Sequence, residues 1–272
     1  RSVTPYKYHS ESLMKKNASN LPYLLLNGSV LIQQHIGRIE MNPWPDEKVG
    51  LDDLRSKLVQ VNSIFSATDF ISLEPSLKKI DTLPEGWNRI LFEFFHQLIQ
   101  ALPLIDLYHE SVEKIANHSE WERFALQENF LPGEILPLQQ LTNSSHLHWI
   151  ARAGAIIQAF LLNCSRYEAW QELSFPKTLE LDTYLGKIVL SGEGDDTYSF
   201  EEPPLLLIDI KGDDLYQNAY AKAGIDRPIS ILIDCGGKDH YLSDTEAFGA
   251  GSSLLGISAL MDLGKGDDVF EG

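Results

Sequence analysis

The 272-residue sequence predicts an α+β protein, with an N-terminal all-helical domain (residues 1–180) followed by a C-terminal parallel β-solenoid, or β-helix (residues 181–272). Two observations predict this division. Apolar residues recur at a spacing of three to four through the first part, whereas short aliphatic runs followed by Gly–Asp turns fill the second. In addition, a Gly–x–Asp–x–aromatic turn occurs four times in the last third.

The helical part is predicted from the spacing of its apolar residues. This spacing predicts helices over Leu51–Phe65, Trp87–Leu102 and Leu107–Phe124, and a long helix through residues 149–161. Ser144 or Ser145 is a candidate cap for the long helix. Because proline cannot donate a backbone hydrogen bond, we expect breaks between helices at Pro103, Pro132 and Pro137.

The last third contains four units of similar sequence: GKIVLSGEGDDTY, PLLLIDIKGDDLY, PISILIDCGGKDHY and LGISALMDLGKGDDVF. Their terminal aromatic residues are spaced by 18, 25 and 29 residues, at Tyr198, Tyr216, Tyr241 and Phe270. A repeat of this length with one main strand per unit is typical of a solenoid. A sheet of hairpins is the competing interpretation. We disfavour it because every unit runs in the same order of strand, turn and aromatic residue.

Alternation along the strands predicts which side chains share a face. One face is apolar, as in Ile229, Ile231 and Ile233, and we expect it to point into the solenoid. The strand-end aspartates would then lie on the outer face. Stacking of the units would produce two ladders of carboxylates, one of strand-end residues (Asp209, Asp234 and Asp262) and one of turn residues (Asp196, Asp214, Asp239 and Asp268).

Such ladders need a compensating interaction, because stacked strands are only about 4.8 Å apart. Two like charges at that distance repel by roughly 1 kcal/mol in water, and by more where water is excluded. Three remedies are open: calcium, which binds six to eight oxygens; backbone N–H donors in Asx-type turns; and raised carboxyl pKa values. The seven ladder aspartates are therefore the candidate metal ligands.

Two of the turns, GEGDDTY and GKGDDVF, resemble the G-x-G-x-D-x-aliphatic/aromatic part of the RTX nonapeptide, which forms calcium-binding turns of a parallel β-roll. RTX turns recur every nine residues, so the adjacent turns that complete each calcium site there are missing here. The whole unit is more similar to the GDD-x-Y repeat proteins of bacteria, which resemble secreted or envelope β-solenoids. The resemblance implies a secreted or envelope location and calcium as the candidate cofactor.

Charge and motifs exclude several classes of function. The net charge is −17, and residues 181–272 hold 18 acidic against 6 basic side chains, so phosphate backbones would be repelled and nucleic acid is not an expected partner. No run of 18 apolar residues predicts a membrane span. Cys164 and Cys235 form no C-x-x-C pair, and the common catalytic signatures are missing.

We therefore expect a non-enzymatic secreted or envelope-associated protein that uses an acidic solenoid for binding or structure. One alternative is a polysaccharide-acting β-helix enzyme with outer carboxylates at Glu193, Asp195 and Asp267, and with His240 as an acid or base. Another is a subunit of a processed precursor. The sequence stops inside a repeat, so we expect that the chain is a fragment, that it was cut there, or that a separate chain continues the solenoid after Gly272.

Overall fold

The structure, a computed structural model, describes residues 49–271 apart from 66–71, 118, 122, 124–136, 138–139, 142–146, 174–177, 219 and 243–250. The chain divides into two compact units, Arg1–Met41 with Pro103–Ala155, and Asn42–Leu102 with Ile156–Gly272. The domain boundary expected near residue 180 stays a prediction. Pro132 and the candidate caps Ser144 and Ser145 lie outside the described residues.

The helices are α3 (Leu51–Phe65), α4 (Glu74–Ile80), α5 (Glu85–Glu113) and α8 (Leu147–Ser165), with a 3₁₀ helix, η1 (Glu168–Glu172). The bounds of α3 are those that the spacing predicts. The expected break at Pro103 is wrong, because α5 runs through this residue. Pro103 is exposed, and Leu102 and Ile105 on either side of it are buried. The apolar stripe thus continues past the proline, and the helix forgoes one backbone hydrogen bond there.

Helix α5 supplies much of the helical core of the second unit. Trp87, Ile90 and Phe94 are fully buried, and the ring of Phe94 lies 5.3 Å from that of Phe160 in α8. From Gly86 onward this helix has the length and composition of a membrane span, and half of its apolar window is buried. The core helix of a soluble protein has the same properties, so the expected lack of a membrane span stays a prediction.

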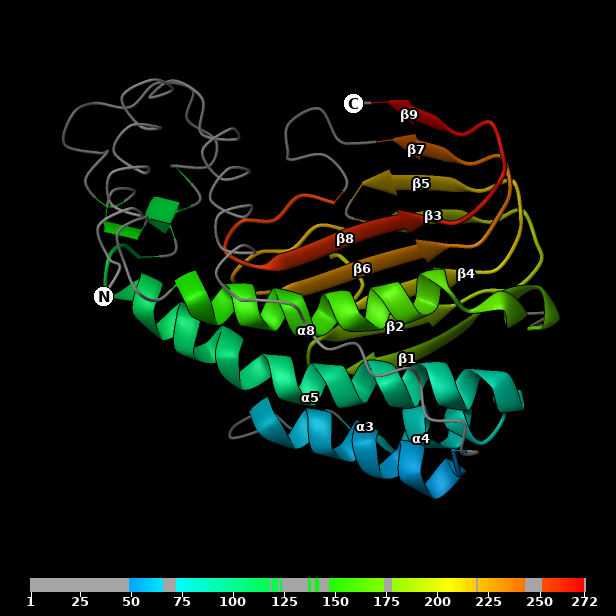
Figure 1. Cartoon of the computed structure of the whole chain (residues 1–272), viewed down its shortest axis with the longest axis horizontal. Helices are drawn as coiled ribbons and strands as arrows, with labels where there is room; N and C mark the ends of the chain where they lie inside the picture. The colour runs from blue at the N-terminus through cyan, green and yellow to red at the C-terminus, as the bar shows by residue number, and fades with distance from the viewer. Residues whose placement is uncertain are drawn as a thin grey trace. The chain divides into compact units, whose positions relative to one another are not determined.

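Two sheets hold the nine strands of the described chain (Figure 1). One has the order β1-β2-β4-β6-β8 and the other β3-β5-β7-β9. The strands are β1 (Leu179–Thr183), β2 (Gly186–Leu190), β3 (Thr197–Phe200), β4 (Leu206–Asp209), β5 (Leu215–Asn218), β6 (Ile229–Asp234), β7 (His240–Leu242), β8 (Ile257–Asp262) and β9 (Val269–Glu271). The pair β1–β2 is antiparallel, and all other neighbours are parallel. The predicted mixed α+β class, helices first and parallel strands after, is confirmed.

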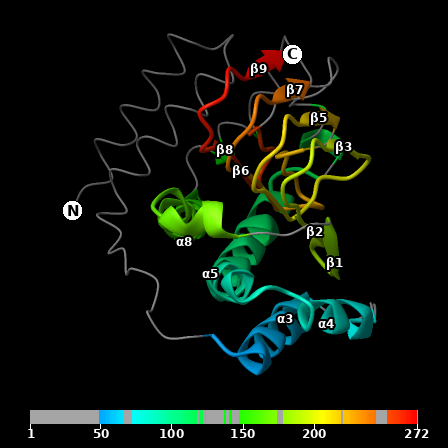
Figure 2. The ribbon, with the colours of Figure 1, turned by 90° about the vertical axis from the view of Figure 1, so that its right-hand side faces the viewer.

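From β2 onward, each successive strand joins the sheet that its predecessor did not, so the chain passes back and forth between the two sheets (Figure 2). We call each such pair of strands a rung: β2–β3, β4–β5, β6–β7 and β8–β9. Equivalent residues pair between rungs, so that Tyr198, Tyr216, Tyr241 and Phe270 form one column. Their rings stack at centroid distances of 5.1, 4.8 and 4.4 Å.

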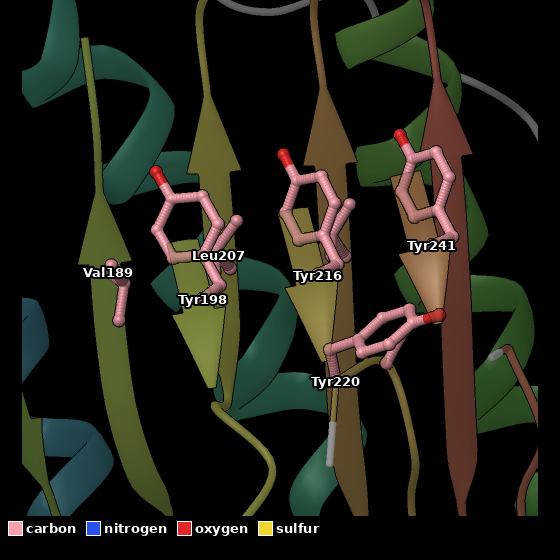
Figure 3. Packing of buried hydrophobic residues seen from close by; sticks show 8 residues of the cluster. Val189, Tyr198, Leu207, Tyr216, Tyr220 and Tyr241 are labelled. Atoms are coloured by element: carbon pink, nitrogen blue, oxygen red, sulfur yellow. The ribbon is translucent and has the colours of Figure 1, made fainter. Parts of the chain in front are cut away.

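Both faces of strands β4 and β6 are buried, which overturns the predicted assignment of faces. Val189, Leu207 and Leu232 pack against the column of tyrosines (Figure 3). The opposite, isoleucine-rich face of these two strands is also buried, and so is Cys235, which follows β6 on that face. The face that carries the strand-end aspartates therefore looks toward the other sheet, and the prediction that they point outward is wrong.

The glycine of each turn lies directly against the turn of the preceding rung. Gly212 and Gly237 have φ angles of +148° and +158°, a conformation that favours glycine. A Cβ atom on Gly237 would overlap the carbonyl oxygen of Gly212, and one on Gly212 would overlap that of Gly194. The repeated glycine is thus required by the close approach of successive rungs as well as by the turn itself.

We expect Gly237→Ala to destabilise the protein by about 3 kcal/mol, since overpacking against backbone can be relieved only by moving a rung. Urea denaturation followed by circular dichroism measures this loss. Gly194→Ala is the matched control, because Gly194 occupies the same turn position in the first rung and a Cβ there meets nothing within 4 Å. Equal effects of the two substitutions would contradict the steric explanation.

Candidate metal centre

The structure brings both predicted ladders of aspartates together. Asp209, Asp234 and Asp262 end β4, β6 and β8, and they are paired in register. The turn aspartates precede β5, β7 and β9 in the same way that Asp196 precedes β3. Burial is greatest in the middle of the column, where Asp209 and Asp234 are 0% exposed, Asp214 is 2% and Asp239 is 1% exposed. Asp196, Asp262 and Asp268 are partly exposed.

Tyrosine hydroxyls and backbone amides hold the strand-end carboxylates. Tyr198 donates a hydrogen bond to Asp209, and Asp234 Oδ2 accepts from Tyr216 at 2.6 Å and from Tyr241 at 3.1 Å. The amide two residues on donates to the other oxygen, from Lys211 to Asp209, from Gly236 to Asp234 and from Gly264 to Asp262, each at 2.9 Å. These are the Asx-type interactions expected for such turns.

The turn aspartates connect one rung to the next. The backbone amides of Asp196, Asp214 and Asp239 donate to Oδ1 of Asp214, Asp239 and Asp268 in the following rung, at 2.6, 2.8 and 2.9 Å. The exposed residue that precedes each turn aspartate makes the opposite connection. Asp213 N donates to Asp195 Oδ1, and Lys238 N to Asp213 Oδ1, both at 2.9 Å. Adjacent residues of each turn therefore link the rungs in both directions.

Two contributors to the site were not predicted from the sequence. Ser191 takes the strand-end position in the first rung, since Leu190 pairs with Ile208, and its hydroxyl donates to Asp196 Oδ2 at 2.7 Å. The second contribution comes from the tyrosines, whose hydroxyls donate to the aspartates. The spacing of seven residues within a unit corresponds only to the bond from Tyr241 to Asp234, since Tyr198 and Tyr216 donate to the aspartate of the following unit.

Three carboxylates converge at each of two places in the column. Single oxygens from Asp196, Asp209 and Asp214 lie within 4.8 Å of one another, and so do oxygens from Asp214, Asp234 and Asp239. Oδ2 of Asp214 and Oδ2 of Asp239 are buried and accept no hydrogen bond from the hydroxyls and amides of the described part of the chain. The carboxyl group of Asp209, when protonated, donates to that of Asp214. These buried triads can hold a metal ion. Among the described residues, Asp262 and Asp268 belong to neither triad.

Burial makes the charged form of these carboxyl groups unfavourable. Burial is the largest cause of the raised pKa values, and neighbouring carboxylates add to it, while the hydrogen bonds from Tyr198 and the backbone amides act in the opposite direction. Together these effects raise the pKa of Asp209 to about 8 and those of Asp214 and Asp239 to about 7. Burial also raises the pKa of Tyr198, Tyr216 and Tyr241, so these hydroxyls remain donors. The column requires either protons or a cation to balance its charge.

The residues of the enzyme alternative lie along the exposed turns. Glu193 forms an ion pair with Lys211 at 3.3 Å, and the Asp195 carboxylate accepts the amide of Asp213. His240 Nε2 lies 3.4 Å from Glu271 Oε2. Asp267 is exposed. A catalytic role for any of these residues stays a prediction.

Comparison of the chain with models of protein families, with curated proteins and with solved structures gives no match.

The raised carboxyl pKa values predict how stability depends on pH. A carboxyl group whose pKa is higher in the folded protein than in the unfolded chain, where it is about 3.9, binds its proton more tightly when folded. Its contribution is complete below about pH 4 and is lost as the pH rises through 7 to 8. In chelator-treated protein, Tm should therefore fall by several degrees between about pH 5 and pH 8.5. Asp209→Asn should flatten the profile, and a wild-type Tm that rises over this range would contradict the assignment.

Removal of one tyrosine hydroxyl should destabilise the column without disturbing the stacking. Tyr216→Phe deprives buried Asp234 of a donor at 2.6 Å, and we expect a loss of about 1–3 kcal/mol by chemical denaturation. Tyr216→Leu also removes the stacking on Tyr198 and Tyr241, and it should cost more. A Phe variant as stable as the wild type would show that the hydroxyl contributes nothing.

Proposed function

We propose that residues 181–272 form a parallel β-solenoid that acts as a non-enzymatic acidic scaffold for binding or structure, stabilised by calcium in its buried aspartate triads. The observation that carries this proposal is the pair of buried carboxylate oxygens, on Asp214 and Asp239, that accept no hydrogen bond from the hydroxyls and amides of the described residues. An unpartnered buried carboxylate is costly, and a bound cation removes that cost.

The solenoid is supported by the path of the chain. Strands alternate between two sheets from β2 to β9, and tyrosine pairs with tyrosine and aspartate with aspartate between successive rungs. Repeated units that stack in this way bury a continuous core between neighbours. The glycines that allow close approach recur in every turn, which is the behaviour expected of one structural unit used several times.

Calcium fits the chemistry of the donors better than other common ions. The triads offer oxygen atoms alone, which hard cations prefer, whereas zinc favours nitrogen and sulfur. Magnesium requires near-ideal octahedral geometry and retains several waters, which suits a buried site poorly. Calcium accepts irregular coordination by carboxylates and carbonyls. Asp262 and Asp268 occupy equivalent positions in the last rung but belong to neither triad, so we propose no bound ion for them.

We propose a secreted or envelope location in bacteria, where extracellular calcium reaches concentrations that fill sites with dissociation constants of about 10⁻⁴ to 10⁻³ M.

We also propose that a further chain pairs with the edge formed by β8 and β9. Val269 is 46% and Phe270 59% exposed there, whereas the aromatic rings of the preceding two rungs are stacked on both sides. The strong negative charge argues against nucleic acid as a partner.

A thermal unfolding scan in excess EGTA, in millimolar calcium and in millimolar magnesium tests the proposal. Calcium at about 100 times its dissociation constant should stabilise the folded protein by about 2.7 kcal/mol and raise Tm accordingly. Magnesium should have little effect. An unchanged Tm in calcium would overturn the calcium site and leave protons and Asx-type hydrogen bonds as the compensation for charge.

Asp214→Asn should reverse the response. The asparagine retains the Oδ1 acceptor for the Asp196 amide but replaces the unpartnered oxygen by an N–H₂ donor. The variant should be at least as stable as the wild type in EGTA and should no longer be stabilised by calcium. Asp213→Asn is the matched control, because this exposed neighbour caps the Lys238 amide and belongs to neither triad. Its response to calcium should be that of the wild type.

A further inference from the structure

We infer that the two triads bind two calcium ions side by side and that the carboxylate of Asp214 bridges them. This inference rests on the proposed function, and it adds the number of ions and the residue that couples them.

The shared position of Asp214 carries the inference. Asp214 offers an oxygen within 4.8 Å of one oxygen of Asp196 and one of Asp209. It also offers an oxygen within 4.8 Å of one oxygen of Asp234 and one of Asp239. Its Oδ1 accepts one amide hydrogen bond, whereas its Oδ2 is buried and accepts none from the hydroxyls and amides of the described residues. Asp196 and Asp239 each belong to one triad. The column thus has one central ligand and two outer ones in successive rungs, which are spaced by about 4.8 Å.

The balance of charge favours two ions over one. Five carboxylates make up the two triads, with a combined charge of −5 when all are ionised. One divalent ion leaves −3 in a buried region, and two leave −1. Two divalent ions one rung apart repel each other, and a carboxylate between them screens that repulsion, as in other two-metal sites.

The tyrosine hydroxyl groups that contact the aspartates also divide between the two triads. Tyr198 contacts Asp209 and Asp196 of the first triad, whereas Tyr216 and Tyr241 contact Asp234 of the second. Each proposed ion therefore has a separate set of carboxylates and tyrosine oxygens, with Asp214 in common. This division predicts that one ion can be lost without the other when an outer ligand is changed.

Counting bound calcium tests the inference, by native mass spectrometry and by equilibrium dialysis of the full chain against calcium. The wild type should bind two ions. Asp196→Asn and Asp239→Asn should each bind one, and Asp214→Asn should bind none. Asp213→Asn should bind two. Each asparagine variant retains an oxygen that can accept its rung-to-rung hydrogen bond, and circular dichroism in EGTA verifies that it is folded.

The outcomes separate the two proposals. One ion in the wild type overturns the paired site but leaves calcium stabilisation intact, and this result does not depend on any variant. One ion retained by Asp214→Asn overturns the bridge. No bound calcium in the wild type overturns both the bridge and the calcium-stabilised scaffold. Two ions in the wild type, with the losses expected for the outer and central ligands, support both.

Discussion

The structure of the C-terminal region depends on the stacking of like residues upon like at the spacing of a parallel sheet. This stacking is favourable for the aromatic column, whose ring centroids lie 4.4 to 5.1 Å apart, and for the aliphatic residues that pack against the rings. The same register places Asp209, Asp234 and Asp262 next to one another. A repeat that stacks tyrosine on tyrosine must also stack aspartate on aspartate, and the electrostatic cost of this arrangement has to be met locally.

The turn meets part of that cost with hydrogen bonds. Its two aspartates accept backbone amides from the neighbouring rungs in opposite directions, so each carboxylate links two turns as well as repelling its counterpart. Glycine is needed because the carbonyl of one turn lies where a side chain of the next would be. The tyrosine hydroxyls then reach the strand-end carboxylates from the column of rings. The Gly–x–Asp–x–aromatic pattern is therefore a single structural device, with each residue type required by the others.

Asp214 and Asp239 show where hydrogen bonds are insufficient. Each uses one oxygen to hold the preceding rung and leaves the other buried beside further carboxylates. The same carboxylate groups have two roles here: one oxygen accepts the hydrogen bond that links the rungs, and the other is available to bind a cation. A bound cation would then stabilise the stack itself.

The sequence by itself determined the order of helices and parallel strands, the bounds of α3, the register of the repeats and the membership of both aspartate ladders. These features follow from the spacing of apolar residues and from the residue types in the turns, which depend only on residues close together in the sequence. Only the tertiary structure decided which face of the sheet lies inside. Alternation separates isoleucine from leucine and aspartate, but it cannot predict burial when both faces are covered. The continuation of α5 past Pro103, the hydrogen bonds from tyrosine to aspartate and the convergence of three carboxylates depend likewise on contacts between segments distant in the chain.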